Sequence, residues 1–139
     1  TFDSILLKII DTIEFQRLKN IKQLGLCYYV FPGASHNRFE HSLGVSYLSG
    51  ILIDTLKINQ PELEITERTS LLIKIAGLVH DIGHACFSHF FDHYFLKDKI
   101  DDQCIYHEYR SCLLFEYIVR KYNQFGDKVN RMKVAVGYI

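Results

Sequence analysis

The stretch IAGLVHDIGH, residues 75–84, carries an apolar run directly into His80 and Asp81 and places His84 four positions after His80. Asp is a poor helix former, and burying an imidazole or a carboxylate costs free energy unless the group is paired. The stretch therefore predicts a buried helix that ends at its histidine–aspartate pair. It also predicts that some partner for this pair lies at that end of the helix.

The spacing of apolar residues predicts an all-α fold. The chain has 139 residues with only two prolines, at positions 32 and 61, and no segment of useful length alternates as a strand would. Thr66 is a suitable N-cap for the helix that carries the opening stretch, and Gly83 is a suitable break after it. The helical segments are residues 12–24, 40–57, 66–81 and 107–122, with a shorter helix in FSHFFDHYF (87–95) and another that begins near residue 129.

Two of these segments carry apolar stripes at helical spacing, which predict their buried faces. In residues 12–24 the stripe consists of Ile13, Phe15, Leu18, Ile21 and Leu24. In residues 40–57 it consists of Leu43, Tyr47, Leu48, Ile51, Leu52 and Leu56. We expect both stripes to face the core.

The composition is that of one ordinary globular domain, with 48% hydrophobic and 23% charged residues. Lys and Arg number 16, as do Asp and Glu, so no global field draws the chain to nucleic acid or to a membrane. Arg17, Lys19 and Lys22 could still form a local basic patch on one helix. Nucleic acid is thus a partner that the charge allows but does not indicate.

Neither a membrane span nor a signal peptide is evident in the sequence. No apolar run reaches the roughly 18 residues that a membrane-spanning helix needs. The four cysteines form no CxxC pair, which favours reduced thiols. We therefore expect an intracellular protein of the nucleus or cytoplasm.

The seven histidines suggest a metal site. Six of them lie in the segments 36–41 and 80–93, which include the histidine–aspartate pair. His41 begins the second predicted helix and His80–Asp81 ends the third, so the three residues meet if these helices pack antiparallel. Imidazoles and carboxylates suit a divalent ion such as Zn, Fe or Mn. We expect His36 and His93 to be solvent-facing or structural.

The segments around these residues resemble the catalytic core of the HD-domain dNTP triphosphohydrolases. The resemblance is carried by DTIEFQRLKNIKQLGLCYYVFPGASHNRFEHSLGVSYLSG (11–50) and IAGLVHDIGHACFSHFFD (75–92), and it covers roughly residues 3–125. It implies a helical bundle in which residues 1–139 form part of an HD domain that extends beyond both ends. It also implies that His41, His80 and Asp81 are metal ligands, with a fourth ligand, an Asp, beyond residue 139.

The family's reaction is metal-dependent hydrolysis of a deoxynucleoside triphosphate to a deoxynucleoside and inorganic triphosphate, with Mg accompanying the nucleotide. The resemblance implies roles in proton transfer for His107, Asp92 and His89, and contacts with substrate for Gln23, Leu24, Arg38, His84 and His89. Gln23 and Leu24 match the positions that pack against the deoxyribose. The alternatives are that Arg38 is a surface cation or pairs with Glu40, and that His84, His89 and Asp92 only support the site.

The resemblance further implies a guanine-nucleotide effector site and a homo-oligomer, either a dimer or a tetramer. Asp11, Gln16 and Lys19 lie where the family contacts the guanine. Lys19 stands where the family has an arginine, and a lysine offers no bidentate fork to a base edge. A solvated helix face is the alternative interpretation of these three residues.

Two other functions remain open at this point. The chain could be an HD phosphohydrolase that acts on another nucleotide, or a regulatory module that binds nucleotide or nucleic acid without turnover. The set of His41, His80, Asp81 and His107 favours catalysis, because a binding module needs no such set. Fold resemblance does not fix the substrate, so the site has to decide.

Overall fold

The structure, a computed structural model, describes residues 3–100 and 103–122. In these ranges the secondary-structure elements are all helices, and there is no β-strand. The α-helices are α1 (Ser4–Ile10), α2 (Ile13–Gln16), α3 (Arg38–Asn59), α4 (Glu67–Val79) and α5 (His107–Tyr122). Short 3-10 turns cover Arg17–Asn20, Cys27–Tyr29, Pro61–Leu63 and Gln103–Ile105, and a π-helical segment covers Phe91–Leu96. The predicted all-α class is confirmed, whereas the helix expected near residue 129 lies outside the described residues.

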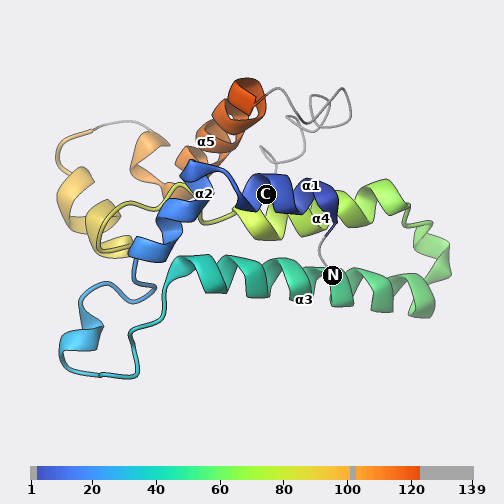
Figure 1. Cartoon of the computed structure of the whole chain (residues 1–139), viewed down its shortest axis with the longest axis horizontal. Coiled ribbons are helices and arrows are strands. Elements are labelled where there is room, and N and C mark those ends of the chain that lie inside the picture. Colours follow the sequence, from blue (N-terminus) through green and yellow to red (C-terminus); the bar gives the residue numbers. More distant parts are fainter. Residues whose placement is uncertain (1–2, 101–102, 123–139) are drawn as a thin grey trace.

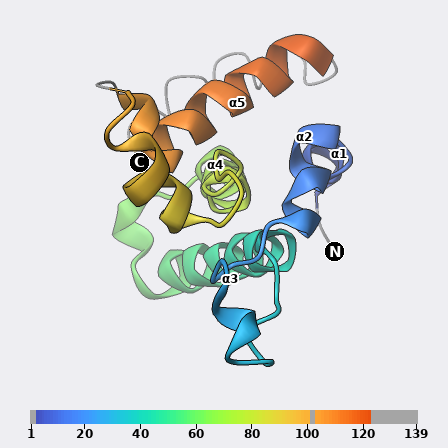
Figure 2. The same ribbon diagram turned by 90° about the vertical axis from the view of Figure 1, so that its left-hand side faces the viewer.

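Helix α4 lies at the centre of the bundle. Figure 2 shows it nearly end-on, with α3 on one side, α5 on another and α1 and α2 on a third. Its residues Ile75, Leu78 and Val79 are fully buried, and they pack in one cluster with apolar side chains of the flanking helices. The opening stretch of sequence is therefore the core helix that its apolar run predicted.

Helices α3 and α4 lie side by side and antiparallel, joined by a short turn at one end (Figure 1). The contact is close because small residues line it. A methyl group added to Gly77 of α4 would lie 2.7 Å from the Ser49 hydroxyl and 3.3 Å from the Cα of Ser46. The Ser46 hydroxyl also donates a hydrogen bond to the Lys74 carbonyl, at 2.8 Å. This close approach brings the start of α3 next to the end of α4.

The predicted buried face of α3 is wrong. The residues that α3 buries are Arg38, Ser42, Ser46, Gly50 and Ile53. Of the predicted stripe, Leu43 and Leu56 are partly buried, whereas Tyr47, Leu48, Ile51 and Leu52 are exposed. Small side chains permit the short distance to α4, and the bulky apolar side chains point away from it.

The single helix predicted over residues 12–24 is divided. Helix α1, which the sequence analysis did not predict, ends just before Thr12, and the Thr12 side chain accepts a hydrogen bond that caps the next helix, α2. After the turn that ends at Asn20 the chain is extended, and Lys22 pairs with Asn37 in an isolated bridge. Accordingly, Ile13 and Leu24 of the predicted stripe are exposed. Backbone hydrogen bonds between residues 21–23 and residues 36–38 replace the helical hydrogen bonds that the apolar spacing predicted.

Other local predictions are confirmed. Thr66 caps α4 through a hydrogen bond from the Thr69 backbone, and α5 spans the predicted residues 107–122. The reciprocal capping box that Asn37 and Glu40 form at the start of α3 was not predicted. The predicted short helix in 87–95 is present in shifted form, as a helical segment from residue 89 that continues into the π-helical turn.

A buried carboxylate ties α2 to α5. Glu14 is 9% exposed and accepts hydrogen bonds from Lys121, at 2.7 Å, and from the Tyr122 hydroxyl, at 3.0 Å. Burial by itself raises the pKa of Glu14, but these hydrogen bonds outweigh it and leave the pKa below 4.5. The folded state therefore favours the ionised carboxylate.

We expect Glu14→Gln to lower the unfolding free energy at pH 7 by about 1 kcal/mol. This is less than the roughly 1.5 kcal/mol or more of a typical charged hydrogen bond, because the Lys121 side chain is 38% exposed. The lowered pKa gives stability above pH 4.5 that is lost as the pH falls below it. The difference between wild type and variant should therefore shrink below pH 4.5. Urea unfolding at a series of pH values measures it, with the exposed Glu62→Gln as the control. A difference that grows on acidification would contradict this account.

No helix in the described residues is both long and apolar enough to cross a membrane. All four cysteines lie in the described part of the chain, and none of them forms a disulfide there.

Candidate metal centre and adjoining histidine cluster

Three residues form a compact donor group where α3 begins and α4 ends. His41 lies in the first turn of α3, His80 is the C-cap of α4, and Asp81 follows it. One side-chain donor atom from each lies within 4.8 Å of those of the other two. The expectation that antiparallel packing brings these residues together is confirmed.

The geometry of His80 suits a metal ligand. Its Nδ1 lies 2.8 Å from the Gly77 carbonyl, so Nδ1 carries the hydrogen and donates it. Its Nε2 then has a free lone pair and lies 3.3 Å from the Asp81 carboxylate. A backbone hydrogen bond of this kind commonly fixes the tautomer of a metal-binding histidine.

The third donor, His41, is held neutral. Burial lowers its pKa although the Asp81 carboxylate opposes the shift. A neutral imidazole keeps the lone pair that a divalent ion requires, and its Nε2 lies 3.5 Å from Asp81. Two imidazoles and one buried carboxylate are donors that fit Zn, Fe or Mn. The group can therefore hold a divalent metal ion.

Arg38 is buried against this group, with 1% of its surface exposed. Its guanidinium donates to the Asp81 carboxylate at 2.6 Å. The alternatives of a surface cation and of a partner for Glu40 are both wrong, because Glu40 instead accepts a hydrogen bond from the Asn37 backbone. Asp81 thus has an arginine on one oxygen and histidines near both.

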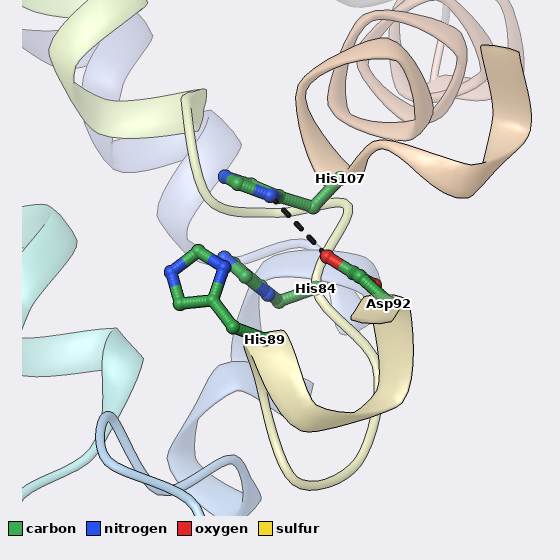
Figure 3. A group of neighbouring side chains, drawn as sticks. All are labelled: His84, His89, Asp92 and His107. Atoms are coloured by element: carbon green, nitrogen blue, oxygen red, sulfur yellow. Dashed lines mark ion pairs between the residues drawn. The ribbon is translucent and has the colours of Figure 1, made fainter. Parts of the chain in front are cut away.

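A second donor group adjoins the first. Figure 3 shows His84, His89, Asp92 and His107 turned toward one another from the turn after α4, the short helix that follows it and the start of α5. Their donor atoms also lie within 4.8 Å of one another. The His84 and His107 rings stack with centroids 3.7 Å apart, and His107 Nδ1 lies 3.4 Å from Asp92.

His84 is the most deeply buried of the histidines. None of its surface is exposed, and neither ring nitrogen has a hydrogen-bond partner among the residues that the structure describes. Burial, followed by the charge of Arg38, lowers the pKa of His84 to about 2. His84 is therefore neutral and lies beneath the surface, whereas His89 is exposed.

His107 lies between the two groups. Its Nε2 is 3.8 Å from the Asp81 carboxylate, and its Nδ1 faces Asp92. Burial lowers its pKa, against the opposing effects of Glu108 and Asp81. Asp92 and His107, to which the resemblance assigns proton transfer, therefore lie side by side.

Two arginines that the sequence analysis did not place in the site hold its backbone. Arg17 donates to the His84 carbonyl at 2.7 Å and to the Ile82 carbonyl. Arg110 donates to the Gly83 carbonyl at 3.0 Å and also pairs with Asp92. Three successive carbonyls of the turn are thus held by guanidinium groups. The proposed basic patch on residues 17–22 is accordingly wrong for Arg17, which is directed into the protein.

The other residues that the sequence analysis named are not members of the two donor groups. Gln23 is partly buried, and its side-chain oxygen has no partner among the described residues, while Leu24 is 51% exposed. Gln16 donates its amide hydrogen to the Ile10 carbonyl. Lys19 lies over the Phe39 ring at 4.7 Å. Three further predicted residues, Asp11, His36 and His93, are exposed.

The sequence model of the family described as HD domain matches residues 38–133. The chain belongs to the HD-domain family. HD domains are metal-dependent, and in this HD domain the group of His41, His80 and Asp81 can supply the protein ligands.

The chain is also similar to named proteins. It is 56% identical over 118 residues to deoxynucleoside triphosphate triphosphohydrolase SAMHD1 of Mus musculus. The aligned residues make up 85% of this chain and 18% of the relative. It is 48% identical over 115 residues to the SAMHD1 homolog of Dictyostelium discoideum, covering 82% and 22%. It is 47% identical over 135 residues to the putative HD domain-containing protein L394 of Acanthamoeba polyphaga mimivirus, covering 87% and 29%. The chain thus spans about a fifth of the length of the vertebrate relatives.

Proposed function

We propose that the protein hydrolyses deoxynucleoside triphosphates to a deoxynucleoside and inorganic triphosphate. The observation that carries this proposal is the shared Asp81 carboxylate, which lies 3.3 Å from His80 in the metal-binding group and 3.8 Å from His107 in the second group. The names of the vertebrate and Dictyostelium relatives support this choice of substrate.

The metal-binding residues in this proposal are His41, His80 and Asp81. The ion is Zn, Fe or Mn, with Mg accompanying the nucleotide. When bound, such an ion would polarise a phosphoryl oxygen and lower the pKa of a water molecule. The chain's own contribution is to fix the donors: the Gly77 carbonyl orients His80, and Arg38 holds the Asp81 carboxylate.

We assign the proton for the departing 5′ oxygen to His107. The Asp92 carboxylate faces its Nδ1 at 3.4 Å, which leaves Nε2 directed toward the Asp81 side of the site. The negative charge of a bound triphosphate would raise the lowered pKa of His107, because a nearby opposite charge favours the protonated imidazole. His89, exposed at the rim, donates to phosphate oxygens, and buried His84 supports the His107 ring by stacking.

Sugar selection is assigned to Gln23 and Leu24. We expect Gln23→Ala to lower the ratio of kcat/KM for dGTP over GTP by about 10-fold, because a looser pocket admits the 2′-hydroxyl. Steady-state kinetics on the full-length protein measure the ratio, with the exposed Gln60→Ala at the far end of α3 as the control. An unchanged ratio in the Gln23 variant would place sugar recognition elsewhere.

A guanine-nucleotide effector at Asp11, Gln16 and Lys19 and a dimeric or tetrameric state are part of the same proposal. Asp11 and Lys19 are exposed and available, whereas the Gln16 amide would have to leave the Ile10 carbonyl. Sedimentation with and without GTP tests whether the nucleotide drives assembly. An intracellular site of action, in the nucleus or cytoplasm, completes the proposal.

Product analysis tests the reaction itself. The full-length protein is incubated with each dNTP, and the products are separated by ion-exchange chromatography. Deoxynucleoside with triphosphate is the expected pair. Release of phosphate or pyrophosphate would instead indicate another phosphohydrolase reaction, and tight binding without product would indicate a regulatory module.

A further inference from the structure

Ser88 lies in an unusual backbone conformation beside the site. Its φ is 56°, and that of the preceding Phe87 is 62°, so two successive non-glycine residues occupy the left-handed region. Side chains make this region unfavourable, and such residues persist only where surrounding contacts hold them. Ser88 is also buried, with 2% of its surface exposed.

The contacts that hold Ser88 are two hydrogen bonds of its hydroxyl. The hydroxyl accepts from Arg38 Nε at 2.9 Å and donates to the Lys22 carbonyl at 2.6 Å. The backbone segments approach closely here, since a methyl group on Gly25 would lie 2.9 Å from the Phe87 carbonyl oxygen. Ser88 therefore joins the segment of residues 22–25 to the arginine.

Arg38 in turn distributes its donors over three segments. Nε reaches Ser88, Nη1 reaches Asp81 Oδ2 at 2.6 Å, and Nη2 reaches the Gln23 carbonyl at 3.3 Å. The guanidinium thus contacts one oxygen of Asp81 through a single nitrogen. The other oxygen, Oδ1, faces His80.

We propose that Ser88 is a positioning residue that keeps Arg38 from taking both oxygens of Asp81 and couples the Gln23 segment to the metal-binding group. A guanidinium prefers to bind a carboxylate through two parallel hydrogen bonds. The hydroxyl of Ser88 occupies Nε, one of the nitrogens that such a fork would use. The coupling to Gln23 affects sugar selection only if Gln23 contacts the deoxyribose, so this part of the proposal rests on the proposed function.

The consequence of removing the hydroxyl follows from this arrangement. Arg38 Nε would be buried without its acceptor, so the guanidinium would gain by turning to present Nε together with Nη2 to the Asp81 carboxylate. An arginine that holds both carboxylate oxygens competes with a metal ion for them. The Lys22 carbonyl would also lose its donor, so the segment that carries Gln23 would lose one of the hydrogen bonds that tie it to the site.

The test uses Ser88→Gly and Ser88→Ala in the full-length protein. Glycine removes the hydroxyl while tolerating the left-handed backbone, and alanine removes it while keeping the backbone strain. The control is Ser46→Ala, which removes a buried serine hydrogen bond of similar length between α3 and α4. The first readout is the Kd for Mn²⁺, which is obtained by measuring the free ion with electron paramagnetic resonance. The second readout is the ratio of kcat/KM for dGTP over GTP.

We expect both Ser88 variants to bind Mn²⁺ about 10-fold more weakly, within the range found for residues that orient metal ligands, and Ser46→Ala to stay within about twofold of wild type. The dGTP-over-GTP preference should fall in parallel. A Mn²⁺ Kd unchanged in both Ser88 variants would overturn the proposal, and an unchanged preference would overturn the coupling to Gln23. If the wild-type protein hydrolyses no dNTP, the proposed function fails, while the Mn²⁺ titration still decides the role of Ser88.

Discussion

Replacement of Asp81 by Asn is expected to reduce kcat/KM for dNTP hydrolysis on the order of 10³-fold. Asn keeps the shape of the side chain but removes the negative charge that the metal-binding group contributes. The several kcal/mol that a bound ion supplies to phosphoryl transfer would be lost, and each 1.4 kcal/mol corresponds to a tenfold change in rate. Steady-state release of triphosphate by the full-length protein measures the change.

The same variant should also be less stable. Arg38 is 1% exposed and would keep its charge in a buried position without a carboxylate partner. Breaking a buried ion pair in this way costs about 3 kcal/mol, which urea unfolding detects. Asp54→Asn, on the exposed face of α3, is the matched control and should change neither quantity. Full activity of Asp81→Asn would remove Asp81 from the metal-binding group.

Gly83→Ala is expected to lose about as much stability as Asp81→Asn. A methyl group at this position would lie 2.3 Å from the His107 carbonyl oxygen and from the Ser111 nitrogen. These are backbone atoms at the start of α5, so the helix itself would have to move. We expect a loss of about 3 kcal/mol in unfolding free energy, at the upper end for overpacking, measured by urea unfolding.

A displacement of α5 would also break hydrogen bonds at the end of α4. The Ser111 hydroxyl donates to the His80 carbonyl at 2.6 Å and accepts from the Gly83 nitrogen at 2.8 Å, so displacement of α5 also disturbs the end of α4. Gly44→Ala in α3 is the control, because no atom of the described residues, apart from the adjoining residues and backbone of its own helix, lies within 4 Å of the added methyl group. It should raise stability by up to about 1 kcal/mol, as alanine does in helices. A Gly83→Ala variant as stable as wild type would contradict the close approach of α5.

The parts of the fold that the sequence predicted are those that local chemistry determines. Helix α4 follows from its apolar run and the Thr66 cap, and α5 lies where its periodicity placed it. The meeting of His41 with His80 followed from one assumption, antiparallel packing, which the short connection at residues 61–63 enforces.

The two failures have different physical causes, one in tertiary packing and the other in local capping hydrogen bonds. The periodicity of α3 indicated its bulky apolar residues as the buried face, but close packing against Gly77 selects the side that carries Ser42, Ser46 and Gly50. The break at Thr12 depends on capping hydrogen bonds, which the spacing of apolar residues does not reveal. Spacing alone cannot distinguish a small-residue contact from a solvated face.

The sequence predicted the donor residues of the candidate site but not the residues that hold its backbone in place. Arg17 and Arg110 occur in ordinary amphipathic helical sequence, where basic residues usually face solvent. Their partners are backbone carbonyls of residues 82–84, which carry no signal in the sequence. Ser88 was missed for the same reason. A burial as deep as that of Arg38 or His84 is likewise a property of the packed structure.

The central claim is that hydrolysis depends on a metal ion held by His41, His80 and Asp81, and one measurement tests it most directly. The full-length protein is stripped of metal with a chelator, and triphosphate release from a dNTP is followed as Mn²⁺ is added back, in wild type and in the His80→Ala, Asp81→Ala double variant. We predict that Mn²⁺ restores release in wild type and restores none in the double variant, while both remain folded by circular dichroism. Release from the double variant at the wild-type rate would contradict the account.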